Sequence, residues 1–355
     1  MNDNSRKLKV LHVLKSSVYS GAENVVITII KHLEQIFDMV YVATDGSIRQ
    51  TLEKEHVKYC LFSQFSRQNL KKVFTEQTPD IVHAHDFSAT VLCASIGGGF
   101  RLISHLHYDP PWTRRWNLKT AVYRCCYRRI DCVLTVSENS FRNMVFAEKF
   151  SDKYMVMGNP VDGTRIRCRA QVSGEESDFC DLIFVGRLVE QKNPQRFIHL
   201  VAALRDRGWK DIKAWMLGSG EMEEECKDLV VEYGLQSHVK LKGFQENPYP
   251  FIKRARVLCI TSRWEGFGLV AIEANMLGVP VVSTDNSGCS EIFGTDALEI
   301  CRSDEEFLDR ISCLLQSASE YELWRKRALE RGDRFDNISK YMKKMAEIYK
   351  SRFVI

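Results

Sequence analysis

The chain has 355 residues, 45% of them hydrophobic and 27% charged, and its formal net charge is +4 at pH 7. These values are ordinary for a globular protein, and the length is sufficient for two domains with separate cores. No apolar stretch approaches the roughly 18 residues of a membrane-spanning helix, and the polar N-terminus leads directly into an apolar run, so we expect neither a transmembrane segment nor a signal peptide.

Strand-like apolar runs alternate with helix-like segments along the whole chain. In the first half, these runs predict strands at residues 10–14, 39–43, 81–85, 102–107, 132–136 and 155–157. Helical patterns lie between them, for example at residues 24–33 and 117–128. The alternation starts again in the second half, with predicted strands at residues 182–185, 214–217, 239–241, 257–260 and 281–283.

Such alternation predicts parallel sheets that are covered by helices on both faces. A polar stretch at residues 163–178 separates the two series, so we expect two doubly wound α/β domains, residues 1–165 and 166–337. The tail, residues 338–355, begins with apolar residues at helical spacing and is expected to form one more helix. Ligands bind outside the carboxyl ends of the strands in such sheets, so the functional residues are expected there.

One segment of the second half combines a strand, a glycine turn and a helix. Residues 257–260 are uniformly apolar and predict a buried parallel strand. Gly266 and Gly268 allow a tight turn and a close approach of the backbone to a ligand. The following helix is expected to start near Leu269 and to end before Gly278. Its free N-terminal N–H groups suit a phosphate.

Two glutamates accompany this turn: Glu265 lies in it, and Glu273 lies in the second turn of the helix. Their carboxylates can accept hydrogen bonds from hydroxyl groups while the helix end holds an anion. The pattern therefore points to a ligand that carries both sugars and phosphates. The alternative is a structural turn with one exposed glutamate and a second glutamate on the helix surface.

This segment resembles the C-terminal signature of retaining GT-B glycosyltransferases of family 4, and further motifs follow in the family's order. In the second half, Gly186-Arg187-Leu188 with the later Lys192 is similar to the family's Gly-Arg-Leu segment. In the first half, the similar segments are Ser20-Gly21-Ala22-Glu23, Asp80-Ile81-Val82-His83-Ala84-His85, Ile103-Ser104-His105-Leu106-His107, Val136-Ser137-Glu138 and Asn159-Pro160-Val161-Asp162. The resemblance covers nearly the whole chain. It implies two Rossmann-like domains that face each other across a cleft, with the C-terminal helix crossing back to the first domain.

The resemblance also implies roles for charged residues. A fixed guanidinium at Arg187 and a mobile ammonium at Lys192 suit a diphosphate, and they would stabilise the leaving nucleoside diphosphate. The alternative is a pair of surface residues at a junction between a loop and a helix. By the same resemblance, Glu273 would bind the ribose hydroxyls, Glu265 the transferred sugar, and His107 would lie close to the reactive carbon.

The remaining donor contacts implied by the family come mainly from the backbone. The N–H groups of the turn would face the sugar and phosphates, namely those of Gly266, Phe267, Gly268 and Leu269. Gly21 would let the first domain approach the diphosphate, or else it is only a turn glycine. Gly243 and Phe244 end another predicted strand and are expected beside the base. Neither a metal nor a cofactor is expected, because basic residues and helix ends replace the metal in this family.

Histidines suggest a rival hypothesis. Two His-x-His pairs lie at the ends of predicted strands, His83 with His85 and His105 with His107. Imidazoles at this spacing can reach one metal, and the carboxylates of Asp86 and Asp109 lie nearby. A metal-dependent hydrolase or deacetylase is therefore the enzyme alternative. A further alternative is a non-catalytic subunit that binds a nucleotide sugar.

Residues 110–130 are basic and aromatic and contain no acidic residue. Tryptophan favours a membrane interface, and arginine and lysine favour anionic headgroups. The expected membrane or acceptor residues are Trp112, Arg114, Arg115, Trp116, Lys119, Arg128 and Arg129. The alternative is a solvated helix whose aromatic face packs on the sheet. Nucleic acid is not expected, because no recognised binding module is present.

Together these features predict a glycosyltransferase that moves a hexose or N-acetylhexosamine from a nucleotide sugar, with UDP favoured, to a glycan or lipid-linked acceptor. The family implies retention of configuration and a place in surface polysaccharide or lipopolysaccharide assembly. Twelve cysteines without a Cys-x-x-Cys pair fit a reducing compartment. We therefore expect a cytoplasmic enzyme, peripheral on the inner face of an anionic membrane.

Overall fold

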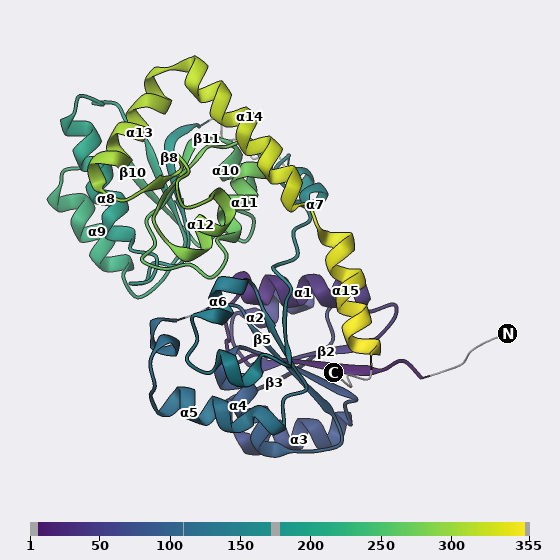
Figure 1. Ribbon diagram of the computed structural model, residues 1–355. Helices are drawn as coiled ribbons and strands as arrows, with labels where there is room; N and C mark the ends of the chain where they lie inside the picture. The colour runs from purple at the N-terminus through teal and green to yellow at the C-terminus, as the bar shows by residue number, and fades with distance from the viewer. Residues whose placement is uncertain (1–5, 109, 172–177, 352–355) are drawn as a thin grey trace. The chain divides into compact units, whose positions relative to one another are not determined.

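The computed structural model describes residues 6–108, 110–171 and 178–351. The chain divides into two compact units, each built on one parallel sheet (Figure 1). Unit 1 contains Met1–Pro160 and Ile338–Ile355, and unit 2 contains Val161–Asn337. The sequence analysis placed the first division after residue 165. It lies before helix α7 (Gly163–Arg169) instead, because α7 packs against α10 and α11 of unit 2.

The sheet of unit 1 has the strand order β3-β2-β1-β4-β5-β6-β7. Its strands are β1 (Lys9–Val13), β2 (Asp38–Thr44), β3 (Tyr59–Phe62), β4 (Ile81–His85), β5 (Arg101–Leu106), β6 (Cys132–Thr135) and β7 (Tyr154–Val156). Its helices are α1 (Gly21–Leu33), α2 (Ile48–Lys54), α3 (Arg67–Gln77), α4 (Asp86–Ile96), α5 (Leu118–Cys125), α6 (Glu138–Arg142) and α15 (Ile338–Lys350), with 3-10 turns η1 (Pro111–Arg114), η2 (Cys126–Arg128) and η3 (Ala147–Phe150).

The two faces of this sheet differ in chemistry. Alternate residues of a strand point to opposite faces, so Leu11 and Val13 join the apolar core under α3, α4 and α5. His12 lies between them on the other face, in register with Tyr41 and His83 of the neighbouring strands. Helices α1 and α15 lie on that side (Figure 1). The C-terminal helix thus completes unit 1, as predicted.

The sheet of unit 2 has the order β10-β9-β8-β11-β12-β13. Its strands are β8 (Cys180–Val185), β9 (Ala214–Leu217), β10 (Val239–Gly243), β11 (Ala255–Ile260), β12 (Val281–Thr284) and β13 (Ile300–Cys301). Its further helices are α8 (Pro194–Asp206), α9 (Glu223–Glu232), α10 (Tyr249–Lys253), α11 (Leu269–Met276), α12 (Ser287–Phe293), α13 (Asp304–Gln316) and α14 (Ala318–Phe335).

Both faces of this second sheet are apolar, as expected for a parallel sheet between helices. Phe184 and Met216 pack into the core formed with α8, α9 and α13. On the opposite face, Trp215 meets the ring edge of Phe251 of α10, with centroids 5.9 Å apart. The predicted alternation of strands and helices is confirmed in both units. The sequence analysis missed β3, an edge strand, and β13, which has only two residues.

Within the described residues, no helix is long and apolar enough to cross a membrane.

Candidate functional site

The turn between β11 and α11 is built as the sequence suggested. Gly268 has a φ of +72° and directly precedes the helix, a backbone conformation that side chains disfavour. Gly288 of α12 packs against this turn: a Cβ there would lie 2.8 Å from Glu265 Cβ and 3.0 Å from the Phe267 nitrogen. Leu269 begins α11, and the aromatic ring of Phe267 is buried. The turn is therefore packed closely against α12.

Lys192 and Glu265 form a nearly buried ion pair. The ammonium nitrogen lies 2.5 Å from Glu265 Oε1, and the two side chains are only 19% and 7% exposed. Ser262 Oγ donates to the same carboxylate oxygen over 2.6 Å. A buried charge pair of this kind requires good geometry and additional hydrogen bonds to offset desolvation. The site thus places a fixed cation and a hydrogen-bonding carboxylate side by side.

Hydrogen bonds to backbone groups hold these two residues in register. The loop after β8 carries Lys192, and such hydrogen bonds join it to the turn after β11. Arg263 N donates to Gln191 O over 2.8 Å, Gln191 Nε2 donates to Trp264 O over 3.1 Å, and Thr261 Oγ1 donates to Lys192 O over 3.0 Å. The two loops follow adjacent parallel strands, so their separation in sequence does not separate them in space.

A third loop completes this edge of the sheet, and the sequence analysis missed it. Gly218 and Gly220 directly follow β9. A Cβ on Gly218 would lie 1.8 Å from Gly186 O, and one on Gly220 would lie 2.3 Å from Leu188 O. Only glycine allows so close an approach of two backbones. A Gly-x-Gly directly after an apolar run was the signal that could have revealed it.

Glu273 lies on α11 in a different environment from Glu265. It is partly buried, and burial raises its pKa to about 7. The hydroxyl of Tyr249 donates to Glu273 Oε1 over 3.2 Å, and the charge of Arg169 also opposes the shift. The carboxyl therefore changes its charge near neutral pH. Tyr249 and Arg169 belong to this environment and were not anticipated.

The other donor residues predicted in unit 2 lie at the same edge of the sheet. Arg187 is exposed, and its Nη2 donates weakly to Gln191 Oε1 over 3.4 Å. Gly243 ends β10 with a φ of +66°, and Phe244 is 53% exposed. Gly266 is buried within the turn. These positions leave a cation, an aromatic ring and the start of a helix at the carboxyl ends of the strands.

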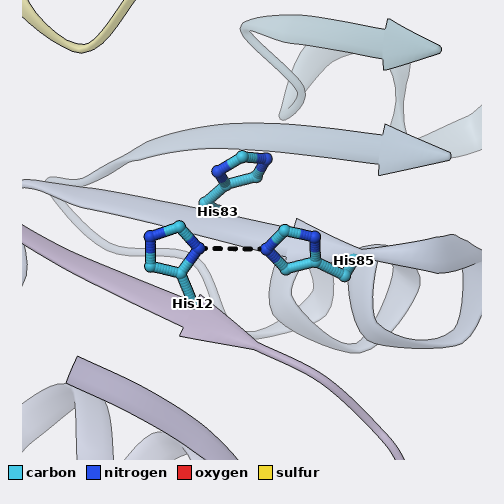
Figure 2. A group of neighbouring side chains, drawn as sticks. All are labelled: His12, His83 and His85. Carbon is cyan, nitrogen blue, oxygen red and sulfur yellow. Dashed lines mark hydrogen bonds between the residues drawn. The ribbon is translucent and has the colours of Figure 1, made fainter. Parts of the chain in front are cut away.

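In unit 1, five imidazoles gather on one face of the sheet at the ends of β1, β4 and β5. They are His12, His83, His85, His105 and His107. The ring centroids of His83 and His85 are 4.3 Å apart, and those of His105 and His107 are 4.1 Å apart. The two predicted His-x-His pairs thus lie beside each other, and His12 joins them. Figure 2 shows His12, His83 and His85 with the hydrogen bond that connects two of them.

These imidazoles are electrically neutral at pH 7. Burial lowers the pKa of His12 to about 3 and that of His107 to about 4, where a hydrogen bond with Asn159 opposes the shift. Burial also holds the pKa values of His83, His85 and His105 well below 6.5. Only His107 among the five is partly exposed. It is therefore the ring through which the row can meet a ligand.

Two groups of three within this row have the spacing of metal ligands. His12, His83 and His85 form one group, and His85, His105 and His107 form the other. Among the described residues no carboxylate belongs to either group. Asp86 accepts instead a hydrogen bond from the backbone nitrogen of His107, and Asp109 lies outside the described residues. The groups offer neutral nitrogen ligands alone.

Gly21 is the first residue of α1, which therefore begins before the helical pattern predicted at residues 24–33. It is exposed, and Ser20 precedes it with an extended backbone. The hydroxyl of Ser20 hydrogen-bonds the carboxylate of Glu23, which is buried in the first turn. This helix start therefore already contains one acidic side chain.

The basic aromatic segment is only partly a surface. Trp116 is 61% and Leu118 80% exposed, and Arg114, Arg115, Lys119 and Arg128 are exposed around η1 and α5. Trp112 instead packs edge to face on Phe87 of the core, with centroids 4.9 Å apart. Arg129 places its Nε and Nη2 in the interior, and its guanidinium lies over the ring of Phe100. Trp112 and Arg129 therefore do not belong to the exposed surface, contrary to the sequence-based prediction.

Comparison with known protein families covers both units. Residues 19–165 match the model of Glycosyltransferase Family 4, and residues 169–331 match that of Glycosyl transferases group 1. The solved structure of Anabaena HepE, in complex with UDP and glucose, superposes with a TM-score of 0.82 over 96% of this chain and 99% of that one. The identity is 19%, so this likeness concerns the fold.

Two curated relatives extend the comparison. The capsular polysaccharide biosynthesis glycosyltransferase CapH of Staphylococcus aureus is 24% identical over 82% of this chain and 86% of its own length. The N-acetylgalactosamine-N,N'-diacetylbacillosaminyl-diphospho-undecaprenol 4-alpha-N-acetylgalactosaminyltransferase of Campylobacter jejuni is 27% identical. That match spans 60% of this chain and 58% of the relative.

Proposed function

The chain belongs to the GT-B glycosyltransferases, and on this premise we propose that its donor is a nucleotide sugar with UDP as the nucleotide. The transferred group is a hexose or an N-acetylhexosamine. The observation that carries the proposal is the buried Lys192–Glu265 pair at the start of α11. The UDP and glucose bound to HepE support the choice of nucleotide.

Each donor residue has a role that fits its surroundings. The ammonium of Lys192 has three N–H donors, so it can hold Glu265 and still donate to a diphosphate oxygen. Exposed Arg187 adds a guanidinium fork to the same anion. Charge that develops on the leaving diphosphate is then stabilised by preorganised donors, including the backbone N–H groups at the start of α11. Glu273 accepts from the ribose hydroxyls and Glu265 from the sugar.

We further propose that the reaction retains the anomeric configuration and needs no metal. The acceptor hydroxyl attacks the sugar carbon on the face that the phosphate leaves, and the leaving phosphate takes its proton, so the protein has to supply neither a nucleophile nor a general base. His107 lies beside the reacting sugar, where a neutral imidazole can donate or accept a hydrogen bond. Because the pKa of His107 is about 4, an imidazolium in this position is unfavourable at neutral pH.

The acceptor in this proposal is a glycan or a lipid-linked sugar of a surface polysaccharide or lipopolysaccharide. The names of the relatives support it, since one refers to a capsule and the other to a diphospho-undecaprenol. Exposed Trp116 and Leu118, with Arg115 and Lys119 beside them, form a surface that suits the cytoplasmic face of an anionic membrane. A lipid-linked acceptor would be met there.

The test is a transfer assay in the presence of a chelator. UDP-, GDP- and ADP-sugars are offered with lipid-linked glycan acceptors, and the released nucleotide and the anomeric coupling of the product are measured. The proposal predicts UDP release, an α-linked product from an α-linked donor, and loss of turnover in Lys192→Met. Lys213→Met is the matched control, because this exposed lysine precedes β9 at the opposite edge of the same sheet. Turnover that requires added metal would contradict the proposal.

One observation favours a second candidate, a metal-dependent hydrolase. It is the convergence of imidazoles in two groups of three. If deacetylase substrates are cleaved only after addition of zinc, and Lys192→Met has no effect, the hydrolase hypothesis replaces the transferase.

A further inference from the structure

Three of the histidines form one hydrogen-bonded chain from the interior of unit 1 to its surface. His12 Nδ1 lies 3.1 Å from His85 Nε2, and His85 Nδ1 lies 2.8 Å from His107 Nε2. His12 and His85 are fully buried, whereas His107 is partly exposed. The row of hydrogen bonds therefore connects the partly exposed ring of His107 with two buried rings.

The protons in this chain depend on one another. A neutral imidazole has one N–H and one lone pair, and each hydrogen bond in the chain requires one proton. If His12 carries its proton on Nδ1, His85 accepts at Nε2 and must donate from Nδ1. His107 then accepts at Nε2 and carries its own proton on Nδ1. The reverse order would place the proton of His12 on Nε2.

The surroundings of His12 decide between the two orders. Among the described residues, the buried Nε2 of His12 has no hydrogen-bond partner. A buried N–H without an acceptor is rarer and more costly than a bare lone pair. The proton of His12 therefore belongs on Nδ1, where His85 accepts it. Because the row of hydrogen bonds ends at His12, it fixes the tautomers of the three histidines and does not conduct a proton.

Asp86, which directly follows His85, holds the backbone of His107. Its Oδ1 accepts from the His107 nitrogen over 3.3 Å. Asp86 has a φ of +70°, a left-handed conformation that is uncommon for a residue with a side chain. Such strain is typical of functional positions. Two consecutive residues thus hold His107, one at its ring and one at its backbone.

We propose that His85 and His12 are positioning residues that lock His107 in the Nδ1–H tautomer, in which the free nitrogen Nδ1 donates to the side chain of Asn159. Both ring nitrogens of His107 are then engaged, so the neutral ring keeps one fixed orientation beside the substrate and does not act as the general base. The inference rests on the proposed function only for the identity of that substrate. The tautomers themselves follow from the contacts within unit 1.

The direct test is long-range proton–nitrogen NMR of the protein with ring-labelled histidine, which distinguishes the two tautomers of a neutral imidazole. The chain has nine histidines, and single substitutions assign the signals. We expect His12, His85 and His107 all to appear as the Nδ1–H form. An Nε2–H signal for His85 or His107, or one that shifts on stoichiometric zinc binding, would overturn the proposal. This result is independent of whether the protein transfers sugar.

Variants extend the test to turnover. His85→Leu removes both hydrogen bonds, and we expect His107 to lose its Nδ1–H preference while kcat falls about tenfold or more with a smaller change in KM. His85→Asn keeps an N–H near the position of Nδ1 and should restore most of the activity. The matched control is His83→Leu, since His83 lies on the same strand, equally buried, and bonds to Tyr349 instead. Equal losses in His85→Asn and His85→Leu, with the wild-type tautomer of His107 in both, would contradict the proposal.

Discussion

In unit 1, five imidazoles gather at the strand ends, four of them buried, and no carboxylate of the described residues joins the groups they form. In unit 2 the largely buried ammonium of Lys192 lies directly beside the carboxylate of Glu265. The first arrangement keeps its groups neutral, because desolvation is not offset by an opposite charge. The second keeps its charges, because each is paired and hydrogen-bonded. Unit 1 can therefore offer directed hydrogen bonds, and unit 2 can hold an anion.

The same difference determines how the two regions respond to change. A neutral row is sensitive to acid, which adds charge where no partner exists. A charged pair is sensitive to the removal of either member, which leaves the other unpaired. Substitutions and pH can therefore separate the two regions experimentally.

The largest expected effect is the acid sensitivity of unit 1. The folded-state pKa values of the buried histidines lie below the unfolded value of 6.5, so their contribution to stability is present above pH 6.5 and is lost as the pH falls below it. Each such histidine should remove about 1.4 kcal/mol of the free energy of unfolding per pH unit. Urea unfolding at pH 7 and pH 5.5 measures the loss.

His105 offers a specific variant for this experiment. Neither of its ring nitrogens has a hydrogen-bond partner among the described residues. His105→Phe keeps a flat ring, so it should be tolerated at pH 7. It should lower by one the number of protons taken up on unfolding in acid, and so reduce the pH dependence of the free energy of unfolding. His199→Phe, at an exposed position, is the control. An unchanged slope in His105→Phe would show that this ring is not neutral in the folded protein.

The next effect is expected at the charged pair. Lys192→Met leaves Glu265 buried and unpaired, which should cost about 3–5 kcal/mol of stability. Turnover should fall about 100-fold or more, because a donor to the leaving group is lost. The double variant Lys192→Met with Glu265→Gln should regain stability but not turnover. If it regains both, the pair is structural.

A smaller effect is expected at Glu273, which lies between these two extremes. Its folded-state pKa of about 7 is above the ordinary 4.5, so its contribution to stability is present below pH 4.5 and is lost as the pH rises through 7. Glu273→Gln mimics the protonated carboxyl. It should raise the free energy of unfolding at pH 8 by about 3 kcal/mol and leave it unchanged at pH 4.

Nucleotide binding should depend on Glu273 in the opposite way, because it requires the ionised carboxylate whereas stability favours the protonated form. Ribose hydroxyls donate to the ionised carboxylate, so the affinity for UDP should fall up to about tenfold per pH unit below pH 7. Calorimetric titrations at pH 6 and pH 8 measure this dependence. An affinity that is independent of pH would mean that Glu273 does not bind the ribose.

The smallest effect concerns the surface of η1 and α5. Replacing exposed Arg114, Arg115 and Lys119 by Gln should weaken binding to anionic vesicles, because each basic residue contributes about 1 kcal/mol near such a surface. Arg129→Gln is the informative comparison: its guanidinium is partly interior, so this change should affect stability more than vesicle binding. Sedimentation with vesicles that contain phosphatidylglycerol measures the binding of both variants.

Much of this arrangement could be predicted from the sequence, because it depends on local patterns. Apolar runs of the right length predicted the parallel strands, and the glycines around Glu265 predicted the turn after β11. Strand ends in a parallel sheet meet at one edge, so Lys192 and Glu265 were expected near each other. For Lys192 and Glu265, the residues next to them in the sequence were sufficient to predict their position in the fold.

Other features depend on partners that are distant in the sequence. No local pattern connects His12 with His85, or Tyr349 with His83, because α15 follows unit 2 in the chain. Trp112 and Arg129 were assigned to the surface from composition alone, yet both find aromatic partners in the core. The raised pKa of Glu273 likewise depends on burial that its sequence neighbours do not reveal.

The most direct test of the central claim is the thermal stability of the wild-type protein and of Glu273→Ala with UDP, GDP, ADP and their sugars in the presence of a chelator. A ligand that binds only the native state stabilises it by about 2.7 kcal/mol at 100 times its Kd. We predict that UDP and a UDP-sugar raise the melting temperature of the wild type more than the other nucleotides do, and that Glu273→Ala loses the shift. No shift with any nucleotide, together with a shift on addition of zinc, would contradict the account.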